Sequence, residues 1–137
     1  MSDYSIFTDA SFCHDNKIAF LGIVILNSNG EIIKRKQRRI CNSSMVGEME
    51  SIVCALTLIP EHSNVTVFND CLHAHKILLK NNKRNYIKSR NKFLKVKEKH
   101  NNIHIEYLID NSNNWCREAH NIAWKSLRKF KKQRMNK

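Results

Sequence analysis

Three carboxylates and one imidazole stand at positions where a mixed α/β chain would gather them into one site. Asp9 and Asp70 each close a run of aromatic and β-branched residues, a pattern that predicts a buried strand ending at an acid. Glu48 lies beside the apolar stripe of an amphipathic helix, and His120 lies in a later helical segment. Ionised carboxylates near a core are costly unless they are paired or bound to a cation, so their convergence predicts a divalent-metal site.

The chemistry that fits such a site is phosphodiester hydrolysis with magnesium. Mg²⁺ is a hard, oxygen-seeking ion that keeps waters and phosphate oxygens among its ligands, so one or two carboxylates per ion suffice. The alternative for each acid taken alone is structural, because an Asp at a strand end often forms a turn or caps a helix. The metal prediction therefore depends on Asp9, Glu48 and Asp70 meeting at the same place.

An α/β fold must position these residues, and hydrophobic periodicity outlines it. Strands are predicted over 4–8, 18–26, 32–40, 65–69 and 103–109, and helices over 45–59, 72–79, 85–99 and 114–130. Ala10 and Ser11 predict a turn after the first strand, and 27–31 predicts a hairpin. This order gives a five-stranded mixed sheet, three antiparallel strands and then parallel strands, with helices on both faces. A single domain is expected over 1–130, followed by a disordered basic tail over 131–137.

The same residues resemble the motifs of the ribonuclease H superfamily, and of its type 1 enzymes and their retroelement relatives in particular. Asp9 matches the aspartate of a Y-T-D-x-S strand, Glu48 the glutamate of an A-E-x-x-A-x-x-x-A-L helix, and Asp70 the aspartate of a strand ending T-D-S. The final family motif, A-D-x-L-A, reads Ala-His-Asn-Ile-Ala over 119–123, so His120 stands where most members carry a fourth acid. Some relatives carry A-H-x-L-A at this motif. The likeness covers nearly the whole chain, in order and spacing as well as chemistry.

This resemblance implies a metal-dependent endoribonuclease that hydrolyses the RNA strand of RNA/DNA hybrids. Two Mg²⁺ or Mn²⁺ ions about 4 Å apart would activate a water and stabilise the leaving oxygen. Asp9 would bridge both ions, and Glu48, Asp70 and His120 would divide the remaining coordination. Because an imidazole carries no negative charge, His120 should weaken the binding of Mg²⁺ more than that of Mn²⁺. The alternative for this residue is a structural histidine.

Two other functions stay open. One is a nucleic-acid-binding module that keeps the fold and has lost turnover through His120, and the other is a related nuclease acting on duplex RNA or branched DNA. The connection before the last helix also departs from the family, in which a Gly-His loop is common. It reads Asp-Asn-Ser-Asn-Asn over 110–114, so proton handling by that loop is absent or taken over by His120. Asp110 closes an apolar strand and is a further candidate for approaching the metals.

Clustered positive charge indicates nucleic acid as the partner. The formal net charge is +12, and ten Lys or Arg stand against one acid between Lys76 and His100, so this stretch would attract phosphates regardless of base sequence. Apolar residues interrupt the run at helical spacing, which predicts a reduced form of the basic protrusion found in type 1 enzymes. The candidate nucleic-acid contacts are Ser11, Asn16, Asn42, Ser43, Ser44, Lys88, Arg90 and Lys92. Ser43 and Ser44 precede a helix, so capping is an equal alternative for them.

Cysteine usage predicts only the compartment. Five cysteines without a C-x-x-C pair, and the lack of a signal-peptide pattern, favour a reducing interior and hence the cytoplasm. Zinc is disfavoured, because Cys71, His73 and His75 at period two would point to different sides of a helix. The sequence shows neither a transmembrane run nor a sign of an obligate protein partner, and a monomer is expected.

Overall fold

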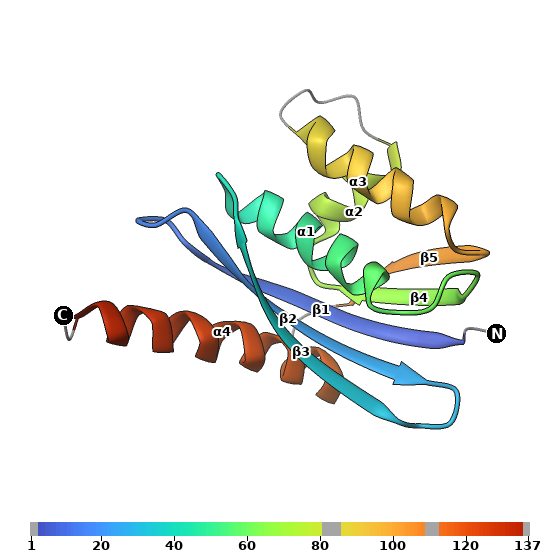
Figure 1. Ribbon diagram of the computed structural model, residues 1–137, viewed down its shortest axis with the longest axis horizontal. Coiled ribbons are helices and arrows are strands. Elements are labelled where there is room, and N and C mark those ends of the chain that lie inside the picture. Colours follow the sequence, from blue (N-terminus) through green and yellow to red (C-terminus); the bar gives the residue numbers. More distant parts are fainter. Residues whose placement is uncertain (1–2, 81–85, 109–112, 136–137) are drawn as a thin grey trace.

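Five strands form one mixed sheet in the order β3-β2-β1-β4-β5 (Figure 1). The computed structural model describes residues 3–80, 86–108 and 113–135. The strands are β1 (Tyr4–Cys13), β2 (Ile18–Asn27), β3 (Ile32–Ile40), β4 (Asn64–Asn69) and β5 (Asn102–Tyr107), and the helices are α1 (Ser44–Thr57), α2 (Leu72–Lys80), α3 (Ile87–Glu98) and α4 (Asn114–Met135). The first three strands pair antiparallel, whereas β4 pairs parallel to both β1 and β5. The predicted fold class is confirmed.

The two faces of the sheet carry different helices. In Figure 1, α1, α2 and α3 lie on one side of the sheet and α4 crosses the other side. Alternation along β1 decides what each face buries. Ile6 belongs to the larger core with Leu56 of α1, and Phe7 belongs to the smaller core with Ala119 of α4. Both α1 and α4 therefore pack against β1, from opposite faces.

The first strand is longer than the sequence predicted. The turn predicted at Ala10 and Ser11 is wrong, because β1 continues to Cys13 and pairs with β2 along its whole length. A long antiparallel partner supplies hydrogen bonds that override the weak strand preference of small residues. β4 is the strand that ends at this level, since its pairing with β1 stops at Thr8. Asp9 therefore lies inside β1, where the parallel neighbour of β1 stops.

The last helix also extends further than predicted. The helix expected to end at Phe130, with a disordered tail after it, continues to Met135. The ring of Phe130 lies 5.3 Å from that of Phe20 on β2, and the guanidinium of Arg134 lies 5.6 Å from the centroid of Phe130. The cations of the last turn also favour the helix, because they face the negative end of its dipole. Packing and charge together explain why residues 131–135 are helical.

Gly22 of β2 lets α4 approach the sheet closely. It pairs with Asp9 across the β1–β2 ladder. A Cβ at this position would overlap the backbone carbonyl of Ala119 and lie 2.9 Å from the backbone nitrogen of Ala123. Only glycine provides the space for this helix backbone, and the contact therefore fixes where α4 passes over the sheet.

Candidate active site

Asp9, Glu48 and Asp70 converge from three different elements. Asp9 lies in β1, Glu48 lies in α1, and Asp70 directly follows β4. One carboxylate oxygen from each residue lies within 4.8 Å of those from the other two, which is a spacing that can hold a metal ion. The structure thus brings together the three acids that the sequence singled out.

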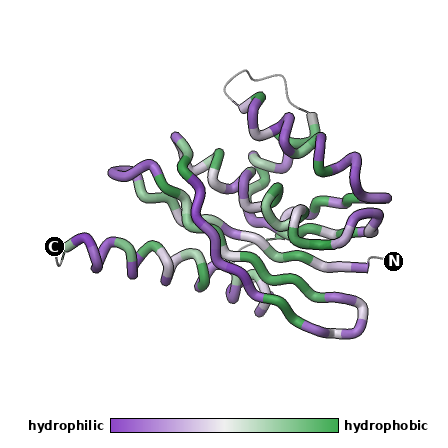
Figure 2. The backbone as a smooth tube through the Cα atoms, viewed as in Figure 1, coloured by the Kyte–Doolittle hydropathy of each residue, from purple (hydrophilic) through white to green (hydrophobic). Residues whose placement is uncertain are grey.

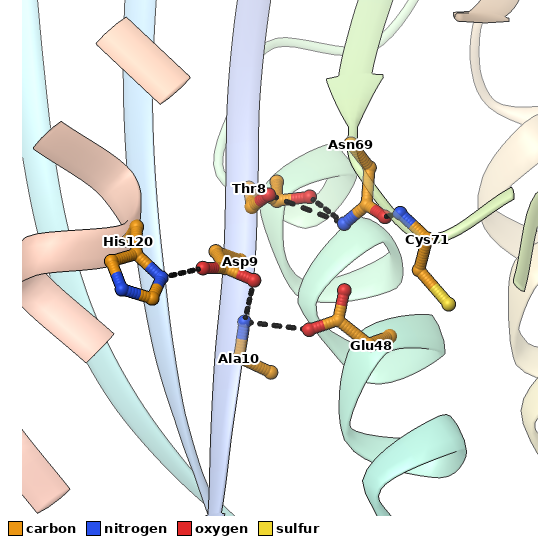
Figure 3. Close-up of polar contacts among 7 residues, drawn as sticks. All are labelled: Thr8, Asp9, Ala10, Glu48, Asn69, Cys71 and His120. Carbon is orange, nitrogen blue, oxygen red and sulfur yellow. Dashed lines mark hydrogen bonds and ion pairs between the residues drawn. The ribbon is translucent and has the colours of Figure 1, made fainter. Parts of the chain in front are cut away.

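The backbone N–H of Ala10 holds two of these acids in place. It donates to Glu48 Oε1 at 2.9 Å and to Asp9 Oδ1 at 2.9 Å (Figure 3). This part of β1 is open to α1 because the pairing between β4 and β1 has already stopped at Thr8. The early end of β4 therefore creates the gap into which α1 places Glu48.

Asn69 positions the third acid, and sequence reasoning missed this role. The residue is fully buried at the end of β4. Its Nδ2 donates to Thr8 Oγ1 at 2.9 Å and to the Thr8 carbonyl at 3.2 Å, and its Oδ1 accepts from the backbone N–H of Cys71 at 2.7 Å. These bonds attach the end of β4 to β1 and fix the turn that carries Asp70. An Asn that bonds the backbone two residues ahead is typical of an Asx turn, and this was the available signal.

Glu48 shows that a cation fits this site. Burial, and then the charges of Asp9 and Asp70, raise the pKa of the Glu48 carboxyl well above its usual range. Its Oε2 atom is buried and has no hydrogen-bond partner within the part of the chain that the structure describes. A divalent cation would give this oxygen a ligand bond and offset the repulsion among three carboxylates. The residues present therefore fit the divalent metal that the sequence predicted.

His120 reaches the site through Asp9. Its Nδ1 lies 2.7 Å from Asp9 Oδ2, and the side chains are 38% and 10% exposed, respectively. In Figure 3 the imidazole and Glu48 lie on opposite sides of Asp9. Among the described residues, the cluster that could hold a metal consists of the three acids without His120. The structure places His120 as a hydrogen-bond partner of Asp9, and direct coordination of a metal by His120 stays a prediction.

Gly22→Ala is expected to separate His120 from Asp9. The added methyl group meets the backbone of α4, which cannot rotate aside as a side chain can, so the helix must shift. We expect a loss of about 1 to 3 kcal/mol in the free energy of unfolding, as for other overpacked contacts, together with a changed NMR signal of the His120 imidazole. Chemical denaturation and the imidazole NMR spectrum measure the two effects.

Gly47→Ala is the matched control for this prediction. A Cβ at Gly47 would lie 2.8 Å from the Cβ of Ala19, so it disturbs the packing of α1 on the opposite face of the sheet. This variant should also lose stability but keep the His120 signal of the wild type. If Gly22→Ala leaves both stability and the His120 signal unchanged, the close contact with α4 does not position His120.

Three of the predicted nucleic-acid contacts lie together. Asn42, Lys88 and Lys92 line a pocket of ≈ 420 Å³ that also includes Lys17. Lys88 and Lys92 share this side of α3 because they are one helical turn apart, whereas Arg90 lies between them in sequence and does not line the pocket. The pocket therefore concentrates three of the cations at the junction of α1 and α3.

The other predicted contacts come from several parts of the chain, and some have structural partners. Ser43 Oγ accepts a hydrogen bond from the backbone N–H of Val46 at 3.2 Å and so caps α1. Asn16 Oδ1 accepts a bond from Cys13 Sγ at 3.3 Å. Ser11 lies within β1 beyond Asp9, Ser44 is exposed at the start of α1, and Asp110 falls outside the described residues.

Lys92 has a partner of its own. Its Nζ lies 2.9 Å from Glu50 Oε1, and the Glu50 side chain is only 8% exposed. This ion pair offsets part of the charge of Lys92 and gives it a structural role, because its removal would leave a buried carboxylate without its cation. Tests of the pocket are therefore better made on its other two lysines.

The sheet order and the three converging acids define a class of protein, the ribonuclease H superfamily. The chain matches the family described as reverse transcriptase-like over residues 7–126 and belongs to that family. It is similar in structure to the N-terminal RNase H domain of Rv2228c from Mycobacterium tuberculosis, determined as a fusion protein with maltose-binding protein. The TM-score is 0.72 at 14% sequence identity, and the match covers 94% of this chain and 99% of that chain. No curated protein matches the sequence.

Family and fold together support a nuclease-type function and binding to nucleic acid. The described helices include none with the length and apolar character needed to cross a membrane.

Proposed function

We propose that this protein hydrolyses the RNA strand of RNA/DNA hybrids with the help of divalent metal ions. The observation that carries the proposal is the convergence of Asp9, Glu48 and Asp70 in a chain of the ribonuclease H fold, with one oxygen of Glu48 buried and lacking a hydrogen-bond partner in the described structure. The net charge of +12 supports a polyanionic substrate.

The three acids would hold Mg²⁺ or Mn²⁺, with two ions expected and His120 as a further candidate ligand. A divalent ion bound there supplies an activated water and neutralises charge on the scissile phosphate. The Ala10 N–H donates to both carboxylates and so holds Asp9 and Glu48 close together. The two side chains should therefore need little rearrangement when the charged substrate binds. Asn69 does the same for Asp70 by fixing the turn after β4.

His120 can also manage a proton beside the acids. An ionised carboxylate only accepts hydrogen bonds, so the proton between His120 and Asp9 belongs to Nδ1 when Asp9 is ionised. The neutral ring then carries its lone pair on Nε2, which is the atom able to take up a proton. Of the two alternatives that the sequence left open, this arrangement supports proton handling by His120 over its absence.

Selectivity for RNA would come from contacts to its 2′-hydroxyl groups. The polar side chains proposed for these contacts are Ser11, Asn16, Asn42, Ser43 and Ser44. Lys88, Arg90 and Lys92 are proposed to contact the backbone phosphates.

The direct test is cleavage of three labelled substrates by the purified protein. RNA/DNA hybrid, duplex RNA and duplex DNA of the same sequence are incubated in Mg²⁺, in Mn²⁺ and in EDTA. We expect products only from the RNA strand of the hybrid, and only with a metal present. Cleavage of duplex RNA or duplex DNA in preference to hybrid would contradict the proposed substrate and favour a related nuclease.

The histidine in place of an acid favours a second candidate function, a binding module without turnover. His120 brings no negative charge to the site, which should weaken the binding of a hard cation. This candidate predicts that the protein binds hybrid and cuts none of the three substrates in either metal. The same experiment, read together with a binding assay, separates the two functions.

Neutralising the pocket between α1 and α3 should weaken the binding of hybrid. Lys17→Gln with Lys88→Gln removes two cations from the pocket and keeps the ion pair of Lys92. Each lost phosphate contact lowers the slope of log affinity against log salt by roughly 0.7 to 0.9, so the double variant should lose roughly 1.5 units. Fluorescence anisotropy in EDTA at several salt concentrations measures the slope.

Lys97→Gln with Lys99→Gln is the matched control. Both residues are exposed at the end of α3, neither lines the pocket, and the change in net charge is the same. The control should keep a slope close to that of the wild type. Equal slopes for the two double variants would show that the pocket does not contact the phosphates.

A further inference from the structure

A second basic groove lies between β3 and the C-terminal half of α4. It has a cavity volume of ≈ 430 Å³. Its lining residues are Phe20, Lys36, Gln37, Arg38, Ser126, Lys129, Phe130 and Gln133. None of them is an acid, whereas three are cations. In Figure 2, β3 is drawn mostly in the hydrophilic colour, although the interior strands beside it are hydrophobic.

The register of the sheet explains why these cations face α4. Along β3, Lys34, Lys36 and Arg38 pair with Val24, Gly22 and Phe20 of β2, which are the residues on the α4 face. Arg39, the next residue along β3, faces α1 instead, because its guanidinium lies 3.5 Å from Cys54 Sγ on α1. Because successive side chains of a strand point to opposite faces, the cations of β3 are divided between the two faces of the sheet.

The aromatic rings in the groove hold cations rather than offering a stacking surface. The guanidinium of Arg38 lies 5.7 Å from the ring centroid of Phe20 and 5.6 Å from that of Phe130. Arg134 lies 5.6 Å from the Phe130 ring as well. The rings thus already contact two guanidinium groups, and a base has little aromatic surface left on which to stack. What the groove offers to a ligand is positive charge.

Little negative charge opposes these cations. Lys34 pairs with Glu118 at 3.2 Å, at the end of the groove nearer the start of α4. From Asn121 to Met135, α4 contains no acid. Within the described residues, no ion pair involves Lys36 or Lys129. The groove therefore presents two lysines whose charges are not paired with any acid in the described part of the chain.

We propose that this groove binds the sugar-phosphate backbone of single-stranded nucleic acid. Its cations match a polyanion, and its volume suits one strand between β3 and α4 better than a duplex. The residues that line the groove come from β2, β3 and α4, and Figure 1 shows α4 on the face of the sheet opposite α1 and α3. The groove is thus a contact separate from the pocket of Lys17 and Lys88, and it would hold an unpaired extension of a substrate rather than the hybrid itself.

The test compares two double variants that lose the same charge. Lys36→Gln with Lys129→Gln removes the two lysines of the groove, neither of which forms an ion pair with a described residue. Arg35→Gln with Lys131→Gln removes two exposed cations of β3 and α4 that do not line the groove. Binding of a labelled oligothymidine is followed by fluorescence anisotropy in EDTA, so the result does not depend on metal or on cleavage. All proteins are first compared by circular dichroism and thermal unfolding.

We expect the groove variant to bind oligothymidine roughly tenfold more weakly, and its salt slope to fall by roughly 1.4 units, because two phosphate contacts at about 0.7 units each are lost. The control variant should stay within about twofold of the wild type. Blunt hybrid should bind equally well to the wild type and to the groove variant. A hybrid with a single-stranded tail should bind the groove variant more weakly than it binds the wild type. Equal losses in both double variants would reduce the effect to net charge and overturn the proposal, as would unchanged binding by the groove variant.

Discussion

Asp70→Asn is expected to reduce hybrid cleavage by at least about 100-fold, because loss of even an outer partner of a metal site typically costs 10 to 100-fold. The substitution keeps the shape of the side chain and the turn that Asn69 forms, and it removes one of the three charges that would hold the metal. Affinity for hybrid in EDTA should stay within about twofold, since Asp70 is not part of the basic pocket. Single-turnover cleavage and anisotropy measure the two quantities.

The same variant should be more stable than the wild type when no metal is present. The raised pKa of Glu48 means that the folded protein binds a proton more readily than the unfolded chain, so stability falls as pH rises from the ordinary carboxyl range toward the raised pKa. Asp70 is the third cause of that shift, after burial and Asp9. At neutral pH in EDTA, Asp70→Asn should therefore unfold about 2 to 4 °C higher, which corresponds to about 1 kcal/mol.

Divalent metal should reverse the order of stability, so that the wild type becomes more stable than Asp70→Asn. Mg²⁺ or Mn²⁺ should raise the melting temperature of the wild type, because a ligand that binds only the folded state stabilises it, and the shift should be much smaller in Asp70→Asn. A variant that cuts hybrid at a rate near that of the wild type, or that shows the full metal-dependent shift, would remove Asp70 from the proposed site.

His120→Asp is expected to raise Mg²⁺-supported cleavage by about tenfold or more. The native protein should favour Mn²⁺ over Mg²⁺, because a neutral nitrogen ligand costs the harder ion more. Its activity should also fall at acid pH, since a protonated imidazole beside Asp9 repels a cation and cannot accept another proton. The substitution restores a fourth carboxylate, and the loss of activity at acid pH should disappear with the imidazole. Cleavage rates in both metals over a range of pH measure the metal preference and the loss at acid pH together.

His120→Ala separates the roles that remain for this residue. If rates in Mg²⁺ and Mn²⁺ are equal in the native protein and unaffected by His120→Ala, the histidine is structural and the site reduces to three carboxylates. If the native protein cuts in neither metal and His120→Asp gains activity, the binding module without turnover is the better description.

The sequence by itself determined the fold class and the three acids. Strand and helix periodicities depend on residues close together in the sequence, so they can be recognised without knowing which distant segments pack against them. They gave a five-stranded sheet with helices on both faces, which the structure confirms. The acids Asp9, Glu48 and Asp70 were recognisable from their positions in those elements, and the structure brings their oxygens within 4.8 Å of one another.

The tertiary structure decided how the acids meet. Sequence patterns predicted that the first strand ends at Thr8, whereas β1 continues to Cys13 and β4 is the strand whose pairing stops at this level. A strand's length depends on its pairing partners, and small residues such as Ala10 and Ser11 do not reveal that β2 is long enough to pair with them. The space for Glu48 beside β1 follows from this difference between neighbouring strands.

The contact of His120 with Asp9 and the second basic groove also depended on the tertiary structure. Gly22 is one residue of an apolar strand in the sequence, and only the packing of α4 shows that the absence of its side chain lets the helix pass close to the sheet. The cations of β3 were not recognised as a surface, because their partners on α4 lie about ninety positions later in the chain. Whether two segments approach closely or share a face of the sheet depends on residues far apart in the sequence. Local sequence patterns therefore do not predict it.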